Sequence, residues 1–223
     1  MKIPFIKRFF KPTNWKNLRS IEPISRFFGF DRGTPIDRVY IEHFLSLNRS
    51  SISGIVCEIS DDYYSKKFGM GVVKFEIFSF SRDLPNVTIA GDLTQLEFLP
   101  KNSIDCFIAT QTLNFIYDYK KAIEGIFHML KEGGVTLVTV SGISQISRYD
   151  MDRWGDFWRF TPLSIFKVFE EVFGVGKVEV SSYGNVLAAV CLLEGISAEE
   201  LTHDELFHMD KDYPITITIK GIK

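Results

Sequence analysis

Cysteine is scarce in this sequence, and its three copies are not placed to form disulfides. Cys57, Cys106 and Cys191 each lie inside an apolar run, where a free thiol behaves as a small hydrophobic side chain. An odd number of such cysteines excludes a secreted domain held by disulfides. His203 and His208 do not have the spacing of a zinc motif. The sequence therefore predicts a protein of the reducing cytoplasm that holds no metal.

Long apolar runs and an excess of one charge are also missing. No run approaches the ~18 apolar residues of a membrane-spanning helix. The formal net charge is -2 and the pI is about 6.1, so no general attraction to nucleic acid is expected. The chain has 223 residues, 45% of them hydrophobic, with 21 phenylalanines. These figures predict one globular domain with a large core.

The first 35 residues differ in composition from the rest. Basic residues alternate with aromatic ones there, and Glu22 is the one acid among the first thirty. Lys7 and Arg8 interrupt any apolar segment that a signal peptide needs. Such an arm is suited to peripheral contact with an anionic membrane. Alternatively, it packs its rings on the domain and keeps its lysines in water. We predict an arm over residues 1–35 and an α/β domain over residues 36–223.

Short apolar runs alternate with helical patterns after the arm. Helices are predicted at 36–45, at 118–131 before the pair Gly133-Gly134, and at 162–173 behind an N-cap at Thr161. Strands are predicted at 55–59, 73–78, 87–90, 104–110, 135–140, 178–180 and 215–219. This alternation predicts a single doubly wound, Rossmann-like α/β sheet. In such sheets, ligands bind at the carboxyl ends of the strands.

Three stretches of the sequence carry a family resemblance. They are Gly91-Asp92-Leu93-Thr94 continuing to Cys106, Thr110-Gln111-Thr112-Leu113-Asn114 continuing to Asp118, and Met129-Leu130-Lys131-Glu132-Gly133-Gly134-Val135. With the order of elements, they resemble the class I S-adenosylmethionine-dependent methyltransferases, specifically a small bacterial type linked to polysaccharide or glycan modification. The resemblance covers roughly residue 54 to the C-terminus. It implies a mostly parallel seven-stranded sheet whose last strand is antiparallel.

The resemblance also implies where S-adenosylmethionine binds. Its aminoacid end belongs at the turn after the first strand, its ribose at the end of the second strand and its adenine at the turn after the third strand. The loop after the fourth strand flanks the methyl group. The implied cofactor residues are Glu58, Ser60, Asp61, Ser81, Asp92, Leu93, Thr110, Gln111 and Thr112.

Two of these positions depart from the family pattern. The family's G-x-G-x-G turn is replaced by a sequence without glycine, with Ser60 at its first glycine. The family's ribose acid is replaced by Ser81, whose neutral hydroxyl weakens that contact by ~1 kcal/mol.

The loop at 141–160, named the lid here, is the candidate acceptor site because it is long and follows the central strand. Its arginines and aromatic rings suit a sugar or an anionic carrier lipid. A structural alternative is that its tryptophans fill the seam between helix and sheet while its arginines pair with its acids. Asp152 is the first choice of general base. The candidate substrate residues are Asn114, Arg148, Tyr149, Trp154, Trp158 and Arg159, with Tyr183 and Asn185 as a second wall.

These patterns predict a methyltransferase acting on a small-molecule or glycan-type acceptor. The alternative is a non-catalytic scaffold or partner module that has lost cofactor binding. A nicotinamide dehydrogenase is disfavoured because no G-x-G-x-x-G follows a strand. Nucleic acid is not expected as a partner. The sequence places the protein in the cytoplasm, with the arm allowing contact at a membrane surface.

Overall fold

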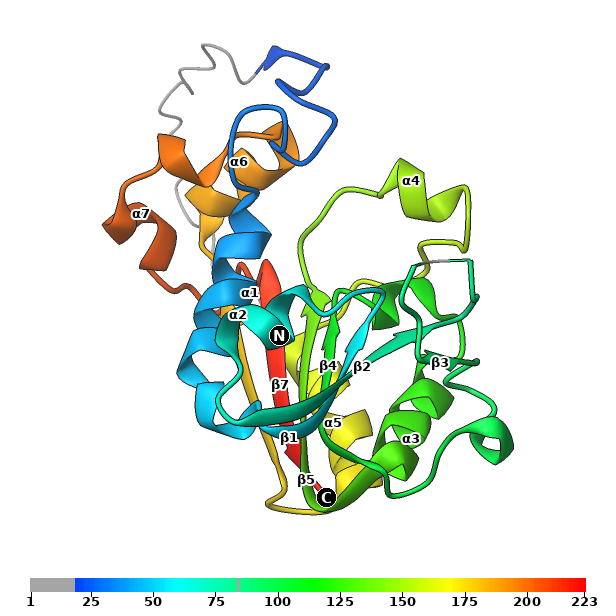
Figure 1. Cartoon of the computed structure of the whole chain (residues 1–223). Helices are drawn as coiled ribbons and strands as arrows, with labels where there is room; N and C mark the ends of the chain where they lie inside the picture. The colour runs from blue at the N-terminus through cyan, green and yellow to red at the C-terminus, as the bar shows by residue number, and fades with distance from the viewer. Residues whose placement is uncertain (1–18, 84) are drawn as a thin grey trace, which may run out of the picture.

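Seven strands form one sheet in the order β3-β2-β1-β4-β5-β7-β6 (Figure 1). The computed structural model describes residues 19–83 and 85–223. All strands run parallel except β7, which is antiparallel to both β5 and β6. This confirms the predicted Rossmann-like sheet with its antiparallel last strand. The strands are β1 (Gly54–Ile59), β2 (Val72–Ser79), β3 (Ile89–Ala90), β4 (Ile104–Thr110), β5 (Leu130–Ser141), β6 (Val178–Tyr183) and β7 (Thr216–Ile222).

Helices cover both faces of the sheet. On one face, α1 (Ile36–Leu47) and α2 (Tyr63–Phe68) pack on Val56 of β1 and Cys106 of β4. On the other face, α3 (Tyr119–Met129) and α5 (Pro162–Phe173) pack on the alternate strand positions, such as Cys57 and Phe107. The remaining α-helices are α4 (Arg148–Met151), α6 (Val186–Glu194) and α7 (His203–Phe207). The short 3-10 helices are η2 (Arg49–Ser51), η3 (Leu96–Phe98), η4 (Leu113–Phe115) and η5 (Ala198–Glu200).

Two of the three predicted helices, α5 and α3, differ in how their first turns are capped. Thr161 caps α5 through a capping box, in which its hydroxyl accepts from the Ser164 N–H and the Ser164 hydroxyl accepts from the Thr161 N–H. Asp118 occupies the N-cap position of α3, but its side chain makes no capping hydrogen bond. The inward face of α5 consists of Ile165, Val168, Phe169 and Phe173, while Phe166 is half-buried.

The predicted end of the third helix is wrong by several residues. The helix α3 stops at Met129, and Leu130 already pairs with Ile104 as the first residue of β5. The next regular pair joins Cys106 to Val135, so the chain between them bulges. Gly133 has a φ of +76° there, a conformation that glycine adopts without steric cost. The glycine pair therefore shapes the start of a strand rather than ending a helix.

All three cysteines are buried in the core, as predicted. Burial raises the pKa of the Cys106 thiol to about 12, and it also raises the pKa of Cys57 and of Cys191. A thiol with a raised pKa is a poor nucleophile at neutral pH. The cysteines are therefore packing residues.

Residues 19–35 pack against the helical insert between β6 and β7. The Ser25 N–H donates to the carbonyl of Glu194 at 2.9 Å, at the end of α6. Arg32 pairs with Glu200 at 2.7 Å, and the Thr34 hydroxyl donates to Glu199. This part of the predicted arm lies on the domain; residues 1–18 fall outside the described residues. Across 19–83 and 85–223, no helix is long and apolar enough to cross a membrane.

Candidate functional site

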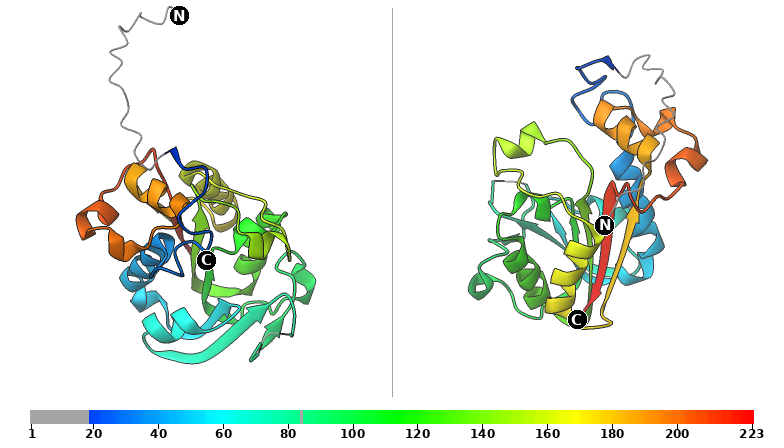
Figure 2. Two further views of the ribbon diagram at one scale, coloured as in Figure 1. Left: turned by 90° about the horizontal axis from the view of Figure 1, so that it is seen from above. Right: turned by 180° about the vertical axis from the view of Figure 1, so that it is seen from behind.

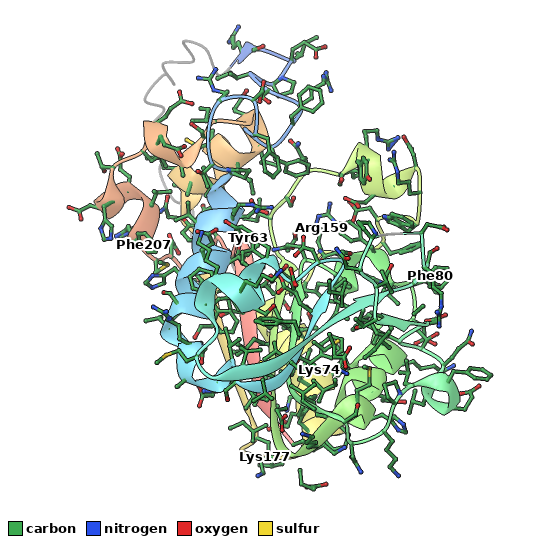
Figure 3. The ribbon with its side chains drawn as sticks, viewed as in Figure 1. Tyr63, Lys74, Phe80, Arg159, Lys177 and Phe207 are labelled. Carbon is green, nitrogen blue, oxygen red and sulfur yellow. The ribbon has the colours of Figure 1, made fainter. Side chains whose placement is uncertain are left out.

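The loops after β1, β2, β3 and β4 meet at one edge of the sheet. The parallel register pairs Ile59 with Phe78, Ser79 with Ala90 and Thr110 with Thr139, so these strands end side by side. The lid rises above this edge (Figure 1). Tyr63, Phe80 and Arg159, labelled in Figure 3, come from the turn after β1, the end of β2 and the lid. The structure thus gathers most of the predicted cofactor residues at one edge.

The turn after β1 forms without glycine. Ser60 adopts a left-handed backbone with a φ of +70°, and its N–H donates to the carbonyl of Phe78 at 2.9 Å. The carboxylate of Asp61 accepts the N–H of Tyr63 at 2.9 Å. Tyr64 is buried in the cluster that α1 forms with β1 and β4. An open depression of about 450 Å³ lies beside this turn, lined by Asp61, Asp62, Tyr63, Lys66 and Lys67.

Glu58 is a buried carboxylate at the end of β1. Its two oxygens accept the N–H groups of Tyr64 at 3.0 Å and Ser65 at 2.7 Å. Burial raises the pKa of Glu58 to about 7, against the opposing effect of these two hydrogen bonds. Glu58 therefore ties the first turn of α2 to the end of β1.

A carboxylate missed by the sequence analysis lies just beyond β2. The Ser81 hydroxyl donates to the carboxylate of Asp83 at 2.5 Å, and the Asp83 N–H donates back to that hydroxyl at 3.1 Å. Asp83 is exposed. The signal in the sequence was an acid two positions after Ser81, the position where the family has its ribose acid. A local turn brings this acid back to the Ser81 hydroxyl.

The turn after β3 presents Asp92 but not the Leu93 side chain. Asp92 Oδ1 accepts both the N–H and the hydroxyl of Thr94. Leu93 is buried in the core beneath α3, because Gly125 allows α3 to approach this turn closely. A ligand at this turn would therefore meet Asp92 and the backbone rather than the side chain of Leu93, which the resemblance implied as a cofactor residue.

The loop after β4 holds a second left-handed residue. Gln111 has a φ of +50°, its N–H donates to Thr139 O at 2.8 Å, and its Oε1 accepts the Ser141 hydroxyl at 2.7 Å. Its Nε2 is buried without a hydrogen-bond partner among the described residues. Beside it, the Thr112 hydroxyl donates to the carbonyl of Thr110. Gln111 therefore presents an unsatisfied donor at the end of β4.

Asn114 anchors the lid instead of facing a substrate. Asn114 is buried. Its side-chain Nδ2 donates to the backbone carbonyl of Trp158 at 3.0 Å, and its own backbone carbonyl accepts the N–H groups of Phe157 and Trp158. Trp158 itself packs against Tyr119 and donates its ring N–H to the carbonyl of Tyr117 at 3.1 Å. Both residues thus fit the structural alternative considered for the lid.

Ion pairing within the lid also follows that alternative. The Asp156 carboxylate is 1% exposed and pairs with Arg159 at 2.5 Å. Arg159 further donates to the carbonyls of Ser144 and Gln145. Burial alone would raise the pKa of Asp156, but the hydrogen bonds from Arg159 and the Ser147 N–H hold it below its usual value. Arg159 therefore closes the base of the lid.

The tip of the lid keeps exposed groups. Arg148, Tyr149 and Trp154 are exposed on and after α4. Asp152 is 66% exposed and lies 3.8 Å from Arg148. Asp150, by contrast, accepts the Ser147 hydroxyl and the Trp154 ring N–H. Asp152 is therefore the less engaged of these two carboxylates.

Tyr183 and Asn185 are not brought to this edge next to β1 and β4. Tyr183 is the last residue of β6 and Asn185 follows that strand, which β7 separates from β5. Tyr183 stacks on Tyr40 of α1. The Asn185 side chain caps α6 at Ala188 N–H and donates to the carbonyls of Glu205 and His208. Asn185 holds the insert together, and Phe207 in Figure 3 marks that side of the molecule.

Within residues 19–83 and 85–223, no group of His, Cys, Asp or Glu is placed to hold a metal ion. His203 instead lies 3.7 Å from Asp204 and stacks on Phe207. The described residues therefore give no geometric basis for metal-assisted chemistry at these histidines.

Comparisons with known proteins find similarity to methyltransferases in part of the sequence and in the fold. The sequence model of a family described as "Methyltransferase domain" matches residues 64–138, which run from α2 into β5. No curated protein sequence gives a significant match. The structure is similar to that of a SAM-dependent methyltransferase from Archaeoglobus fulgidus, with a TM-score of 0.54 and 13% identity, over 89% of this chain and 100% of that one.

Two further solved structures show the range of this fold. One is a phosphoethanolamine N-methyltransferase from Haemonchus contortus, in complex with phosphomonomethylethanolamine and S-adenosylhomocysteine (TM-score 0.51, 14% identity, 81% of this chain and 52% of that one). The other is the cyclase SpnF (TM-score 0.54, 14% identity, 92% of this chain and 87% of that one). At these identities the likeness shows the fold, and the reaction has to be argued from the site.

Proposed function

We propose that this protein is an S-adenosylmethionine-dependent methyltransferase acting on a small-molecule or glycan-type acceptor. The observation that carries the proposal is the pair of left-handed residues, Ser60 and Gln111, that follow the neighbouring strands β1 and β4. A left-handed backbone costs a non-glycine residue about 1 kcal/mol or more. Such strain tends to persist where a site needs it. Both turns lie at the edge where this fold binds ligands.

The residues at this edge fit the cofactor part by part. Ser81 and Asp83 offer oxygen acceptors to a ribose diol. The Asp83 carboxylate supplies the negative charge that the family has at the position of Ser81. Asp92 uses only Oδ1 in its bonds to Thr94, which leaves Oδ2 for an adenine amine. Gln111 Nε2 offers a donor at the end of β4. When bound, S-adenosylmethionine supplies a methyl group activated by its sulfonium.

The tip of the lid is suited to an acceptor with hydroxyl groups. Tyr149 and Trp154 offer exposed rings, and the Arg153 guanidinium stacks on Tyr149 at 3.5 Å from the ring centre. Flat rings pack on the apolar faces of sugars, and guanidinium groups bind hydroxyls or phosphates directionally. Asp152 is our choice for the base that takes the proton of the attacking hydroxyl.

A second candidate function is a non-catalytic partner module. The observation that favours it is the turn after β1, where a serine side chain stands at the position of a family glycine and Asp61 bonds locally to Tyr63. A side chain there restricts how closely a ligand can approach the backbone.

Calorimetric titration of the full chain with S-adenosylmethionine and S-adenosylhomocysteine separates the two functions. We expect measurable binding of both ligands. Asp83→Asn should weaken it about tenfold, because a charge-assisted hydrogen bond is lost. Glu171→Gln, an exposed acid on α5, is the matched control and should bind as the wild type does. No heat and no thermal shift at millimolar ligand would leave only the partner module.

A further inference from the structure

The outward face of α6 is entirely apolar. Val186, Leu187, Val190 and Leu193 are between 36% and 53% exposed, while the opposite face of the helix packs on α1. The charged residue at its end, Glu194, accepts the N–H of Ile24 at 3.3 Å. A surface helix ordinarily turns polar residues outward. The outward face of α6 is therefore an exposed apolar surface.

The loop bonded to the end of α6 carries further exposed apolar side chains. Ile21 is 95% exposed and Phe27 is 68% exposed, on a segment held to the end of α6 by the bond from Ser25 N–H to Glu194 O. Large contiguous apolar patches on a protein surface mark interaction sites. We call the combined surface the apolar corner; its residues are Ile21, Ile24, Phe27 and Phe30 with Val186, Leu187, Val190 and Leu193.

The charge of the sequence that precedes and includes the loop of the apolar corner favours an anionic partner. Residues 1–30 hold seven Lys and Arg against Glu22 alone, although the whole chain has a net charge of -2. The positive charge is thus concentrated in the segment that leads into the corner, and the remainder of the chain is acidic. In the corner itself, Glu22 pairs with Arg26, Asp31 accepts the Ser25 hydroxyl and Glu194 accepts the Ile24 N–H. Close by, Thr34 donates to Glu199 and Arg32 pairs with Glu200. An apolar surface beside a basic segment is the pattern of a protein that lies on an anionic bilayer.

The apolar corner and the lid lie at the same end of the molecule. Figures 1 and 2 show α6, the loop before α1 and the lid beyond the carboxyl ends of the strands. A bilayer against the corner would therefore face the entrance of the candidate site. We propose that the apolar corner docks the protein on an anionic lipid surface and presents the site to acceptors held in the membrane. The second half of this inference rests on the proposed function, whereas the docking itself does not.

Vesicle co-sedimentation of the full chain, without cofactor or acceptor, tests the docking. The vesicles are phosphatidylcholine alone or phosphatidylcholine with one third phosphatidylglycerol. We expect binding to the anionic vesicles that weakens as salt is raised. The variant Ile21→Ser/Phe27→Ser/Leu193→Ser should bind at least about tenfold more weakly, because apolar insertion contributes most of the affinity.

The matched control is Val73→Ser/Val175→Ser, which removes two side chains that are 83% and 87% exposed outside the corner. It should bind as the wild type does. The loop variant Ile21→Ser/Phe27→Ser, at highly exposed positions, repeats the test if the triple variant unfolds. Absence of vesicle binding, or equal loss in the control, overturns the proposal. A concentration-dependent dimer abolished by the corner variant, without vesicle binding, would instead assign the corner to a second copy. None of these readouts depends on methyl transfer.

Discussion

The side-chain amide of Asn114 donates to the carbonyl of Trp158 at 3.0 Å, across 44 positions of sequence. The Asn114 carbonyl accepts two further N–H groups, from Phe157 and Trp158. One residue after β4 therefore clamps the returning end of the lid. The lid is fixed at its base and exposed at its tip, an arrangement suited to holding an acceptor over the strand ends.

Asn114→Ala should loosen the lid. The substitution removes the side-chain amide that donates to the carbonyl of Trp158. We expect the loss of this hydrogen bond to cost about 1–3 kcal/mol of stability. Hydrogen exchange at the amides of residues 142–160 should speed up more than exchange in β4. Asn48→Ala removes an amide bonded to Phe44 O at the end of α1, and it should leave exchange in the lid unchanged. Equal acceleration in both variants would contradict the clamp.

Ser60→Gly should be tolerated or stabilising, by up to about 1 kcal/mol, since glycine adopts a positive φ without steric cost. Ser60→Val should lose about 2 kcal/mol or more, because a β-branched residue suits this conformation poorly. Urea denaturation measures both changes. If the turn binds a ligand closely, Ser60→Gly should also keep or improve the affinity for S-adenosylmethionine. Destabilisation by glycine would show that the serine side chain supports the turn.

Gly125→Ala should destabilise the fold by about 2 kcal/mol or more. A Cβ at Gly125 would lie 2.0 Å from the carbonyl oxygen of Leu93, so α3 would have to move off the turn after β3. Gly91→Ala is the comparison, because its Cβ would lie 3.5 Å from Leu99, an ordinary contact. Thermal denaturation should place the Gly91→Ala variant near the wild type. Similar losses in both would contradict the close approach of α3.

Glu58 should make stability depend on pH. Its pKa is raised to about 7 in the folded protein from an ordinary value of 4.5, so the folded state binds more protons between these values. The stabilisation that protonated Glu58 contributes to the free energy of unfolding is therefore fully present below pH 4.5. It is lost as the pH rises toward 7, and the loss is on the order of 3 kcal/mol. Urea denaturation across this range should show the decline.

Glu58→Gln should flatten that decline, whatever its effect on stability at a single pH. The variant keeps one acceptor for the N–H groups of Tyr64 and Ser65, so an overall loss is also expected. An unchanged slope would mean that another group titrates in this range.

The sheet could be predicted because its signals are local. The run that forms β4 is apolar and bounded by turns, and its predicted limits at 104–110 match the structure. The prediction of where α3 ends failed because a glycine pair suits a strand bulge as well as a helix end. Only the pairing of Leu130 with Ile104 decides between these two structures. Pairing across the sheet is a property of the fold and cannot be read from a local window.

The sequence predicted where the candidate site lies in the sheet better than it predicted the role of each side chain. The strand ends brought together Ser60, Asp92 and Gln111 as expected from topology. The roles of Asn114 and Leu93 depended on which way their side chains pack, and that is set by the lid and by α3. Asp83 was missed because a tight turn, rather than the strand period, carries it back to Ser81.

The insert that carries α6 leaves and rejoins the sheet at a single point, where the Ile215 N–H donates to the carbonyl of Tyr183 at 2.8 Å. Its inner side chains are fixed by their packing on α1. Its outer positions do not take part in that packing, so substitutions there should leave the pairing of β7 with β5 in register. If the apolar corner docks the protein as proposed, homologues with this fold could differ in whether they dock, through changes confined to this outer surface.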